Sequence, residues 1–158
     1  YLGVRNVFLL AKPEDDLVCL KLDAKNAFNS VSRKAMFENM YEAAPWLGHF
    51  AAQFFSGPQD LLIAESVGTI PSLRGSLQGD VLGPVEFMLA IEKWLSSLWK
   101  SGLFTKIFAF IDDTFFIFPR AHLSLIWPLV MGIATVGLTL RPEKCILLRC
   151  NDPRLFRG

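Results

Sequence analysis

Residues 106–118 read KIFAFIDDTFFIF, and this stretch decides the fold that we expect for the chain. Two apolar runs, at 107–111 and 115–118, flank the adjacent acids Asp112 and Asp113. Both runs are rich in Ile and Phe and too short to cross a membrane, so they predict buried β-strands. The Asp-Asp-Thr sequence between them predicts the tight turn of a hairpin.

Two neighbouring acids backed by hydrophobic strands are costly unless a positive charge compensates them. A divalent metal ion is the usual compensator, and Mg²⁺ prefers carboxylate oxygen ligands. A solvated turn that happens to be acidic is the alternative interpretation, because Asp is a common turn residue. This stretch alone leaves both interpretations open.

The length and composition suit one domain with its own core. The chain has 158 residues, of which 52% are hydrophobic, and a formal net charge of +1. This total neither supports nor excludes nucleic-acid binding, which depends on local charged patches. Cys19, Cys145 and Cys150 show no CxxC spacing, which indicates a reducing, intracellular compartment and argues against a zinc site. The sequence does not distinguish nucleus from organelle.

Residues 121–140 contain no Asp, Glu, Lys or Arg and approach the length of a membrane-spanning helix. Pro128, Gly132 and Gly137 interrupt the segment, so we prefer a buried helix over 121–136 followed by a turn. Its apolar side chains have little polar surface between them, which predicts burial against a partner protein, with a membrane as the less favoured alternative. The side chains that we expect to be exposed are Leu123, Ile126, Trp127, Val130 and Met131.

Other segments carry clear local signatures. Residues 17–22 alternate between two faces and predict a strand that delivers Asp23 at its end. Residues 74–84 hold three glycines, which indicates backbone freedom or the close approach of a ligand. We further expect a helix capped by Ser30 or Ser32 and running to Ala44, a short helix over 46–55, and a hairpin or an irregular pair of strands within 61–72. A long helix over 85–99 and a final pair of strands at 138–140 and 145–149 complete the expected elements.

If the strand at 17–22 pairs beside the hairpin, Asp23 and Asp112 can share two metal ions about 4 Å apart. Such a pair promotes in-line displacement at phosphorus, because it stabilises both the attacking and the leaving oxygen. Phosphoryl transfer needs positioning and charge neutralisation more than a protein nucleophile. This chemistry suits a chain whose histidines, His49 and His122, stand alone in the sequence.

Four stretches resemble, in order, the palm motifs of reverse transcriptases, particularly those of non-LTR retrotransposons and group II introns. They are DAKNAFNS at 23–30, QGDVLGP at 78–84, FIDD at 110–113, and GLTL with PEKC at 137–145. The resemblance covers about residues 17–148 and implies an α+β right-hand polymerase palm, an antiparallel sheet with helices packed on one face. It implies a single palm domain over 1–158, a fragment from which most of the fingers and the thumb are absent.

The resemblance also implies a metal site. Asp23 and Asp112 would bind two Mg²⁺ ions, for which Mn²⁺ can substitute, with help from the Ala24 carbonyl. Asp113 would assist as a nearby carboxylate. For Asp23 alone, a cap at the end of a strand is the structural alternative.

Further roles follow from the same resemblance. Phe28 would lie under the incoming sugar and exclude a ribose 2′-hydroxyl, whereas an ordinary core Phe is the alternative. Gln78 and Gly79 would line the nucleotide and the template, although a plain turn before a helix has the same sequence. Lys144 would protonate the pyrophosphate leaving group, and a solvated turn lysine explains it nearly as well. Additional phosphate contacts, for which a solvated face is the default, would come from Lys25, Arg33 and Arg74.

The implied partners are an RNA template, a DNA primer and a dNTP. Two departures from the family pattern are Val81 in place of the usual Pro and the bulky Ile111 before the acids. Without fingers and thumb, we expect residues 1–158 alone to be inactive, because a palm cannot grip a primer–template. Two hypotheses therefore stand: an RNA-directed DNA polymerase, or a catalytically idle palm that serves as a structural subunit of a larger, membrane-associated or soluble assembly.

Overall fold

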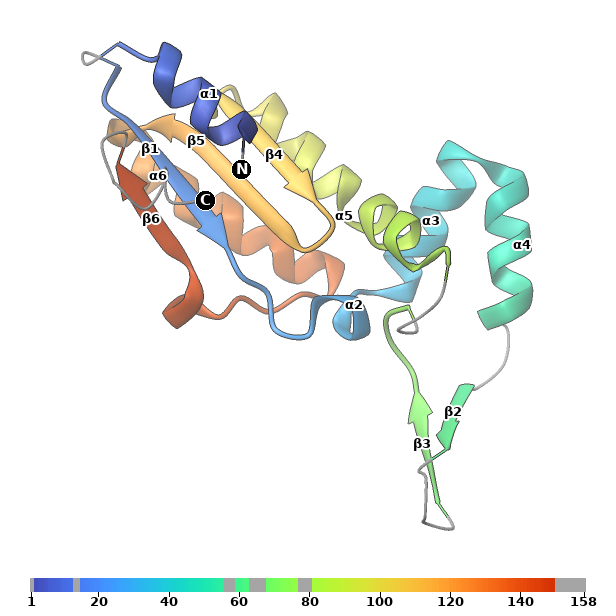
Figure 1. The fold of residues 1–158 in the computed structure, drawn as a ribbon. Helices are drawn as coiled ribbons and strands as arrows, with labels where there is room; N and C mark the ends of the chain where they lie inside the picture. The colour runs from blue at the N-terminus through green and yellow to red at the C-terminus, as the bar shows by residue number, and fades with distance from the viewer. Residues whose placement is uncertain (1, 13–14, 56–58, 63–67, 77–80, 150–158) are drawn as a thin grey trace.

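The computed structural model describes residues 2–12, 15–55, 59–62, 68–76 and 81–149. An antiparallel sheet in the order β4-β5-β1-β6 lies at its centre, with helices around it (Figure 1). The elements in chain order are α1 (Leu2–Leu10), β1 (Leu17–Leu22), α2 (Ala27–Ser30), α3 (Arg33–Ala43), α4 (Pro45–Phe55), β2 (Gln59–Leu62), β3 (Thr69–Ser72), α5 (Gly83–Lys100), β4 (Lys106–Phe110), β5 (Asp113–Pro119), α6 (Leu123–Met131) and β6 (Ile146–Arg149). The predicted α+β class is confirmed.

The predicted hairpin forms, but its turn lies one residue earlier than expected. Phe110 of β4 pairs with Asp113 of β5, so the turn consists of Ile111 and Asp112. Ile111 adopts a positive φ of 56°. A positive φ at the first central residue allows a two-residue turn whose twist matches the strands. Asp113 therefore begins a strand rather than closing a turn.

Strand β5 is buried on both of its faces. Phe116 and Phe118 belong to the main core, whereas Phe115 and Ile117 belong to a smaller core on the opposite side of the sheet. A strand buried on both faces has no solvent side that would require polar residues. This explains why residues 115–118 of β5 form an unbroken apolar run.

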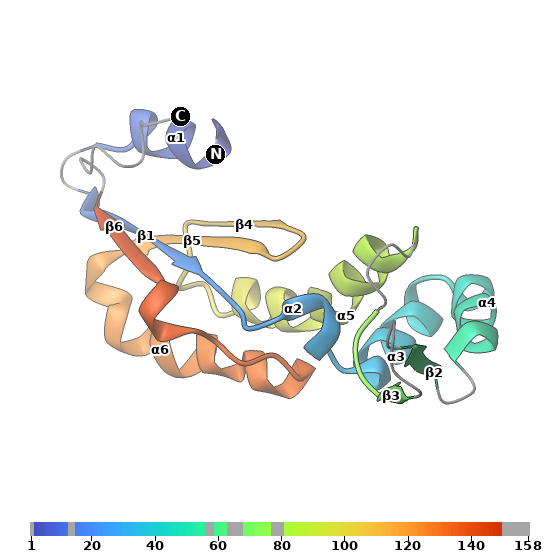
Figure 2. The ribbon, with the colours of Figure 1, turned by 60° about the horizontal axis from the view of Figure 1, so that its bottom comes forward.

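The two faces of the sheet are covered by different helices, as Figure 2 shows. Helices α5 and α6 lie on the face of the main core, as predicted, but α1 packs on the other face through Val4 and Phe8. Successive side chains of β1 point to opposite faces of the sheet, so β1 contributes to both cores. Leu20 faces the main core, and Cys19 faces the smaller core that α1 covers. The expected helices on one face are thus present, and α1 adds cover to the second face.

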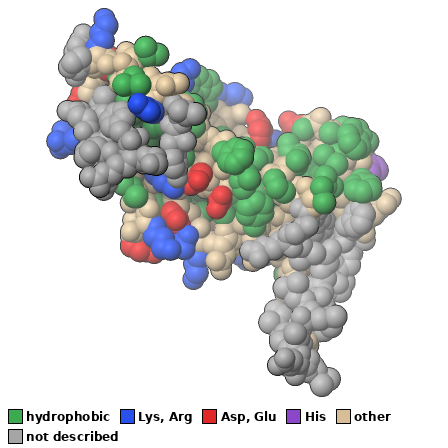
Figure 3. Space-filling view, viewed as in Figure 1, with side chains coloured by type: hydrophobic (Ala, Val, Ile, Leu, Met, Phe, Trp, Pro, Cys, Tyr) green, Lys and Arg blue, Asp and Glu red, His purple; other side chains and the backbone are tan. Residues whose placement is uncertain are grey.

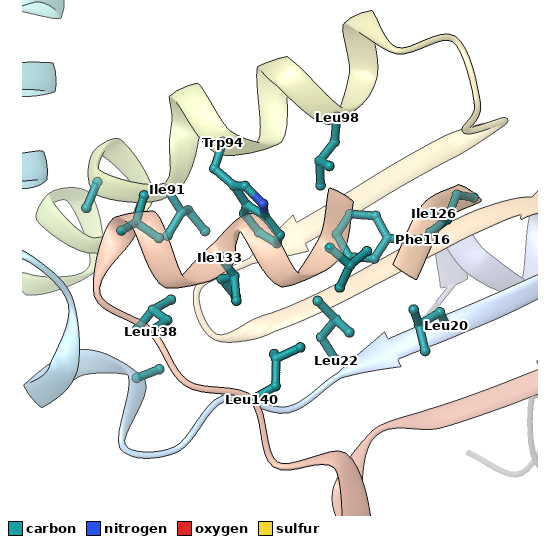
Figure 4. Packing of buried hydrophobic residues seen from close by; sticks show 14 of the residues in the cluster. Leu20, Leu22, Ile91, Trp94, Leu98, Phe116, Ile126, Ile133, Leu138 and Leu140 are labelled. Atoms are coloured by element: carbon teal, nitrogen blue, oxygen red, sulfur yellow. The ribbon is translucent and has the colours of Figure 1, made fainter. Parts of the chain in front are cut away.

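Aromatic and aliphatic side chains from α5, α6 and the sheet meet in the main core (Figure 4). The rings of Trp94 and Phe116 are perpendicular, with centroids 5.9 Å apart, a favourable edge-to-face arrangement. The Trp94 indole N–H also donates to the Leu129 carbonyl of α6 at 3.5 Å. This contact joins the two helices that support the sheet.

The segment predicted as one helix over 121–136 is only partly regular α-helix. It has an α-helical centre, α6, which is followed by a 3₁₀ turn at Gly132–Val136. Ile126 and Val130, expected to be exposed, are instead fully buried in the main core. The exposed apolar side chains of α6 are Leu123, Leu125, Trp127, Leu129 and Met131. Within the described ranges, no helix combines the length and the apolar character that crossing a bilayer requires.

The predicted pairing of 138–140 with 145–149 is wrong. Strand β6 pairs with β1, whereas Leu140 forms a single bridge with Ala24. The Lys25 N–H donates to the Thr139 carbonyl at 2.8 Å beside this bridge. The segment around Leu140 is therefore used to hold the chain just after β1.

Two more local predictions are confirmed. The Ser32 hydroxyl caps α3 by accepting the Ala35 N–H at 3.3 Å. Strands β2 and β3 form the expected antiparallel hairpin, which projects away from the main sheet (Figure 1).

The buried thiol of Cys19 gives a first testable prediction. Burial raises its pKa to about 12, so the reactive thiolate is scarce in the folded protein. We expect iodoacetamide to spare Cys19 between about pH 7 and pH 9 and to modify it once urea unfolds the chain. Peptide mass spectrometry measures this, with the half-buried Cys145 as the internal reference. Equal native rates at the two cysteines would contradict the buried position.

Candidate active site

The pairing of β1 with β5 brings the predicted acids to one end of the sheet. Leu22, the last residue of β1, lies opposite Thr114, the second residue of β5. Asp23 therefore follows β1 at the end of the sheet where Asp112 and Asp113 lie in and after the hairpin turn. The predicted strand pairing is confirmed. Figure 3 shows acidic and basic side chains next to one another in the middle of this view, bordered by hydrophobic side chains.

The backbone before Asp112 is held in an unusual conformation. A β-branched residue with a φ of 56°, as Ile111 has, is a steric outlier that costs about 1–3 kcal/mol. The Ile111 side chain packs against the main core, which holds the turn in place. Asp112 is consequently exposed at the tip of the hairpin.

Asp23 is bound to Arg141 through both side chain and backbone. The Arg141 guanidinium forms an ion pair with the Asp23 carboxylate, using Nε and a terminal nitrogen on the same oxygen. The Arg141 backbone N–H also donates to the Asp23 carbonyl at 2.9 Å. The thiol of Cys145 lies 3.9 Å from that same carbonyl. The bridge between Ala24 and Leu140 continues this contact, so the segment that leads into β6 is fixed against Asp23.

Asp113 has its own cation. The Lys21 ammonium lies 2.9 Å from an Asp113 carboxylate oxygen and 5.5 Å above the centre of the Phe115 ring. Lys21 and Phe115 face each other across β1 and β5. A carboxylate at the hairpin tip is thus neutralised by a lysine that the neighbouring strand supplies.

The donor groups at this end of the sheet fit Mg²⁺ in their chemistry. Carboxylates of Asp23, Asp112 and Asp113 and the Ala24 carbonyl are the hard oxygen ligands that this ion prefers. As the side chains lie, however, the part of the chain that the structure describes contains no group of three or more His, Cys, Asp or Glu positioned to hold a metal ion. A metal ion that binds the carboxylate oxygens that Arg141 and Lys21 contact has to displace these protein cations.

Phe28 lies in α2 and is half-buried. Its ring stacks on the Phe87 ring of α5 with a centroid distance of 5.0 Å and an interplanar angle of 25°. This contact fixes the ring at the edge of the main core. Both interpretations of Phe28, a residue under the sugar and a core aromatic, are compatible with this place.

The chain just before the second palm motif is tied directly to α2. Gly75 has a φ of 67°, and a Cβ at this position would lie only 2.0 Å from the Phe28 carbonyl oxygen. The Gly75 N–H donates to the Val31 carbonyl at 2.9 Å, and the Ser76 N–H donates to the Phe28 carbonyl at 3.1 Å. Only glycine combines this φ with such a close approach. Gln78 and Gly79, predicted to bind substrate, lie outside the described residues.

Arg33 was expected on a solvated face or on a phosphate, and its guanidinium is instead bound to the protein. It donates to the Gly75 carbonyl at 2.9 Å, to the Ser72 carbonyl at 2.7 Å and to the Ser72 hydroxyl at 3.0 Å. Burial lowers the pKa of Arg33, and the nearby Glu86 partly opposes this effect. Arg33 thus holds the end of β3 and the Gly75 turn onto α3.

The remaining basic candidates lie at the surface. Lys144 is exposed in a 3₁₀ turn, Pro142–Lys144, whose last N–H donates to the Arg141 carbonyl at 2.9 Å. Lys25 and Arg74 are exposed as well.

The fold and its edge of acids agree with a family-level comparison. The family model described as reverse transcriptase (RNA-dependent DNA polymerase) matches residues 5–155. The chain belongs to the reverse transcriptase family. The non-LTR or group II subtype that the motifs suggested stays a prediction.

Solved structures of telomerase share the fold of this reverse transcriptase domain. Telomerase from Candida tropicalis in complex with the TWJ fragment of telomeric RNA matches 94% of the chain with a TM-score of 0.66 at 14% identity, over 28% of its own length. Apo telomerase from Candida tropicalis matches 94% with a TM-score of 0.60 at 16% identity, over 31% of its length. Telomerase from Candida albicans in complex with the same type of RNA fragment matches 93% with a TM-score of 0.59 at 11% identity, over 29% of its length. The chain therefore spans less than a third of each of these neighbours.

A search of the curated proteins gave no match.

Three residues that shape this reverse transcriptase site were not predicted from the sequence. Arg141 and Lys21 pair with the acids, and Phe87 supports Phe28. The alternation of β1 placed Lys21 on a face but did not name its partner. Arg141 stood inside the last palm motif with no local feature that pointed to Asp23, which is 118 positions away.

Replacing Gly75 tests the close approach beside Phe28. We expect Gly75→Ala to lower the free energy of unfolding by about 2–4 kcal/mol, because the added Cβ meets backbone and the φ is left-handed. Gly102→Ala is the matched control, since Gly102 has a φ of 70° but no atom within 4 Å of an added Cβ. The control should cost only about 1–2 kcal/mol. Urea unfolding measures both, and equal losses would refute the backbone contact.

Proposed function

We propose that this chain is the palm of an RNA-directed DNA polymerase, which transfers deoxynucleotides from dNTPs to the 3′-hydroxyl of a primer. One observation carries the proposal: in a member of the reverse transcriptase family, β1 and the β4–β5 turn deliver Asp23, Asp112 and Asp113 to the same end of the sheet. Acids gathered there suit nucleotidyl transfer, which depends on charge neutralisation and positioning.

The proposal assigns the metal ligands to this end of the sheet. Asp23 and Asp112 would hold two Mg²⁺ ions, or Mn²⁺ in their place, with the Ala24 carbonyl as a further ligand and Asp113 as an assisting carboxylate. When bound, such a pair of ions stabilises the attacking and leaving oxygens at phosphorus. The exposed position of Asp112 on a fixed turn supports its role, because a ligand on a rigid element keeps its geometry.

Neighbouring residues would select and position the substrate. Phe28, held by its stacking on Phe87, would exclude a ribose 2′-hydroxyl. Gln78 and Gly79 would line the nucleotide and the template strand. Lys144, exposed on the turn after Arg141, would donate a proton to the pyrophosphate leaving group.

The proposed macromolecular partners are an RNA template and a DNA primer. Two of the fold neighbours are telomerases in complex with a fragment of telomeric RNA, which supports RNA as a partner of this kind of fold. We propose that residues 1–158 form a single palm domain and that fingers and thumb, which grip the primer–template, are supplied outside it.

Primer extension on an RNA template tests the proposed function in the full-length natural protein. We expect Asp112→Asn and Asp23→Asn each to lower the extension rate by at least about 100-fold, because each removes a charged ligand. Glu38→Gln is the control, since Glu38 lies on α3 and pairs with Lys34 one helical turn away. Extension that is indifferent to Asp112→Asn would remove the polymerase proposal.

A second candidate function rests on the surface of α6. Leu123, Trp127 and Met131 are exposed on one side of α6, Leu125 and Leu129 are exposed as well, and exposed apolar side chains gathered on one helix are typical of a protein contact. A catalytically idle palm would then serve as a structural subunit of a larger assembly, at a membrane or in solution. Purification of the natural protein should in that case yield stoichiometric partner subunits that are lost with Trp127→Ser and Met131→Ser. If the natural protein had no partner subunits and also failed to extend a primer, both the polymerase and the structural-subunit proposals would be contradicted.

A further inference from the structure

We infer that Arg141 is an internal counter-ion that competes with a divalent metal for Asp23 and thereby sets the metal affinity of the site. The inference rests on the proposed function, in which Asp23 is a metal ligand. It gives Arg141 a defined role, which is to hold Asp23 neutralised until a metal ion displaces the guanidinium.

The position of Arg141 is fixed by backbone contacts rather than by its side chain. Its N–H donates to the Asp23 carbonyl at 2.9 Å, and the adjacent Leu140 is bridged to Ala24. These contacts place the Cα atom of Arg141 beside Asp23 whatever the guanidinium does. The side chain can therefore leave the carboxylate and return to it without any movement of the main chain.

The chemistry of arginine makes this competition direct. A guanidinium is planar and offers several N–H donors to one carboxylate, so it and a metal ion compete for the same oxygen. It donates to the same Asp23 oxygen through two nitrogens, and charge-assisted hydrogen bonds of this kind are strong. A metal that takes this oxygen has to displace both donors.

The partial exposure of the pair allows the exchange. The Arg141 and Asp23 side chains are 31% and 27% exposed, so water and ions reach both of them. Water screens a partly exposed ion pair, which leaves even its strong hydrogen bonds open to displacement by a divalent cation. Lys21 and Asp113 form a second pair of the same kind, with side chains 25% and 45% exposed.

Direct measurement of Mn²⁺ binding by electron paramagnetic resonance tests the inference in the full-length natural protein. Arg141→Gln should bind Mn²⁺ about tenfold more tightly than the wild type, since its Asp23 carboxylate has no competing cation. Arg149→Gln is the matched control because it makes the same charge change on β6, opposite Val18 at the far end of β1. The control should leave the Mn²⁺ affinity within about twofold of the wild type.

Two further variants locate the effect and guard against misfolding. Adding Asp23→Asn to Arg141→Gln should abolish the gain in affinity. Arg141→Lys, which keeps the charge but loses the two-nitrogen contact, should fall between wild type and Arg141→Gln. Without metal, Arg141→Gln should melt at a lower temperature than the wild type, and Mn²⁺ should raise its melting temperature by a larger increment.

Several results would overturn the inference. One is an unchanged Mn²⁺ affinity in Arg141→Gln, and another is a gain in affinity that survives Asp23→Asn. A weaker Mn²⁺ affinity in Arg141→Gln would also do so, because it would make Arg141 a residue that positions Asp23 for the metal. Primer extension by the same protein distinguishes a failure of this inference from a failure of the proposed function. Tighter Mn²⁺ binding without extension would uphold the counter-ion and remove the polymerase, whereas extension with unchanged Mn²⁺ binding would do the reverse.

Discussion

The antiparallel pairing of β1 with β5 is the contact on which the rest of the structure depends. It places these two strands in the middle of the four-stranded sheet, where each is covered on both faces. A shift of one residue would exchange the faces and move Phe116 from the main core to the side of α1. The two cores therefore fix the register, and the register alone decides that Asp23 ends beside the β4–β5 turn.

Charge compensation links this architecture to chemistry. Acids at the end of a hydrophobic sheet need a positive charge nearby, and the sequence suggested a metal ion as its source. In the fold, Arg141 and Lys21 meet the same need for Asp23 and Asp113. A polymerase palm has to release these acids to its metal ions, whereas an idle palm can keep the pairs permanently. The two proposed functions thus differ in what happens at the same two ion pairs.

Three segments with candidate site residues contain or adjoin a residue with a positive φ. Ile111 precedes the exposed acid, Asn26 precedes α2 with a φ of 45°, and Gly75, with a φ of 67°, leaves no room for a Cβ beside the Phe28 carbonyl. Such conformations persist only where packing holds them. Here the main core holds Ile111, and Arg33 holds the Gly75 turn. The rigid surroundings give the short segments that carry candidate site residues a defined position.

The sequence by itself determined the hairpin, the strand before Asp23 and a serine cap on α3, because each depends on local periodicity or on a residue's own hydrogen bonds. The α+β class followed from the resemblance of the motifs to those of reverse transcriptases. Only the tertiary structure decided that β6 pairs with β1, that α1 covers the second face, and that Ile126 and Val130 are buried. It alone brought Arg141 to Asp23 across 118 positions of chain. Contacts between distant segments depend on the packing of whole elements, and a local pattern carries no information about which cation will meet which acid.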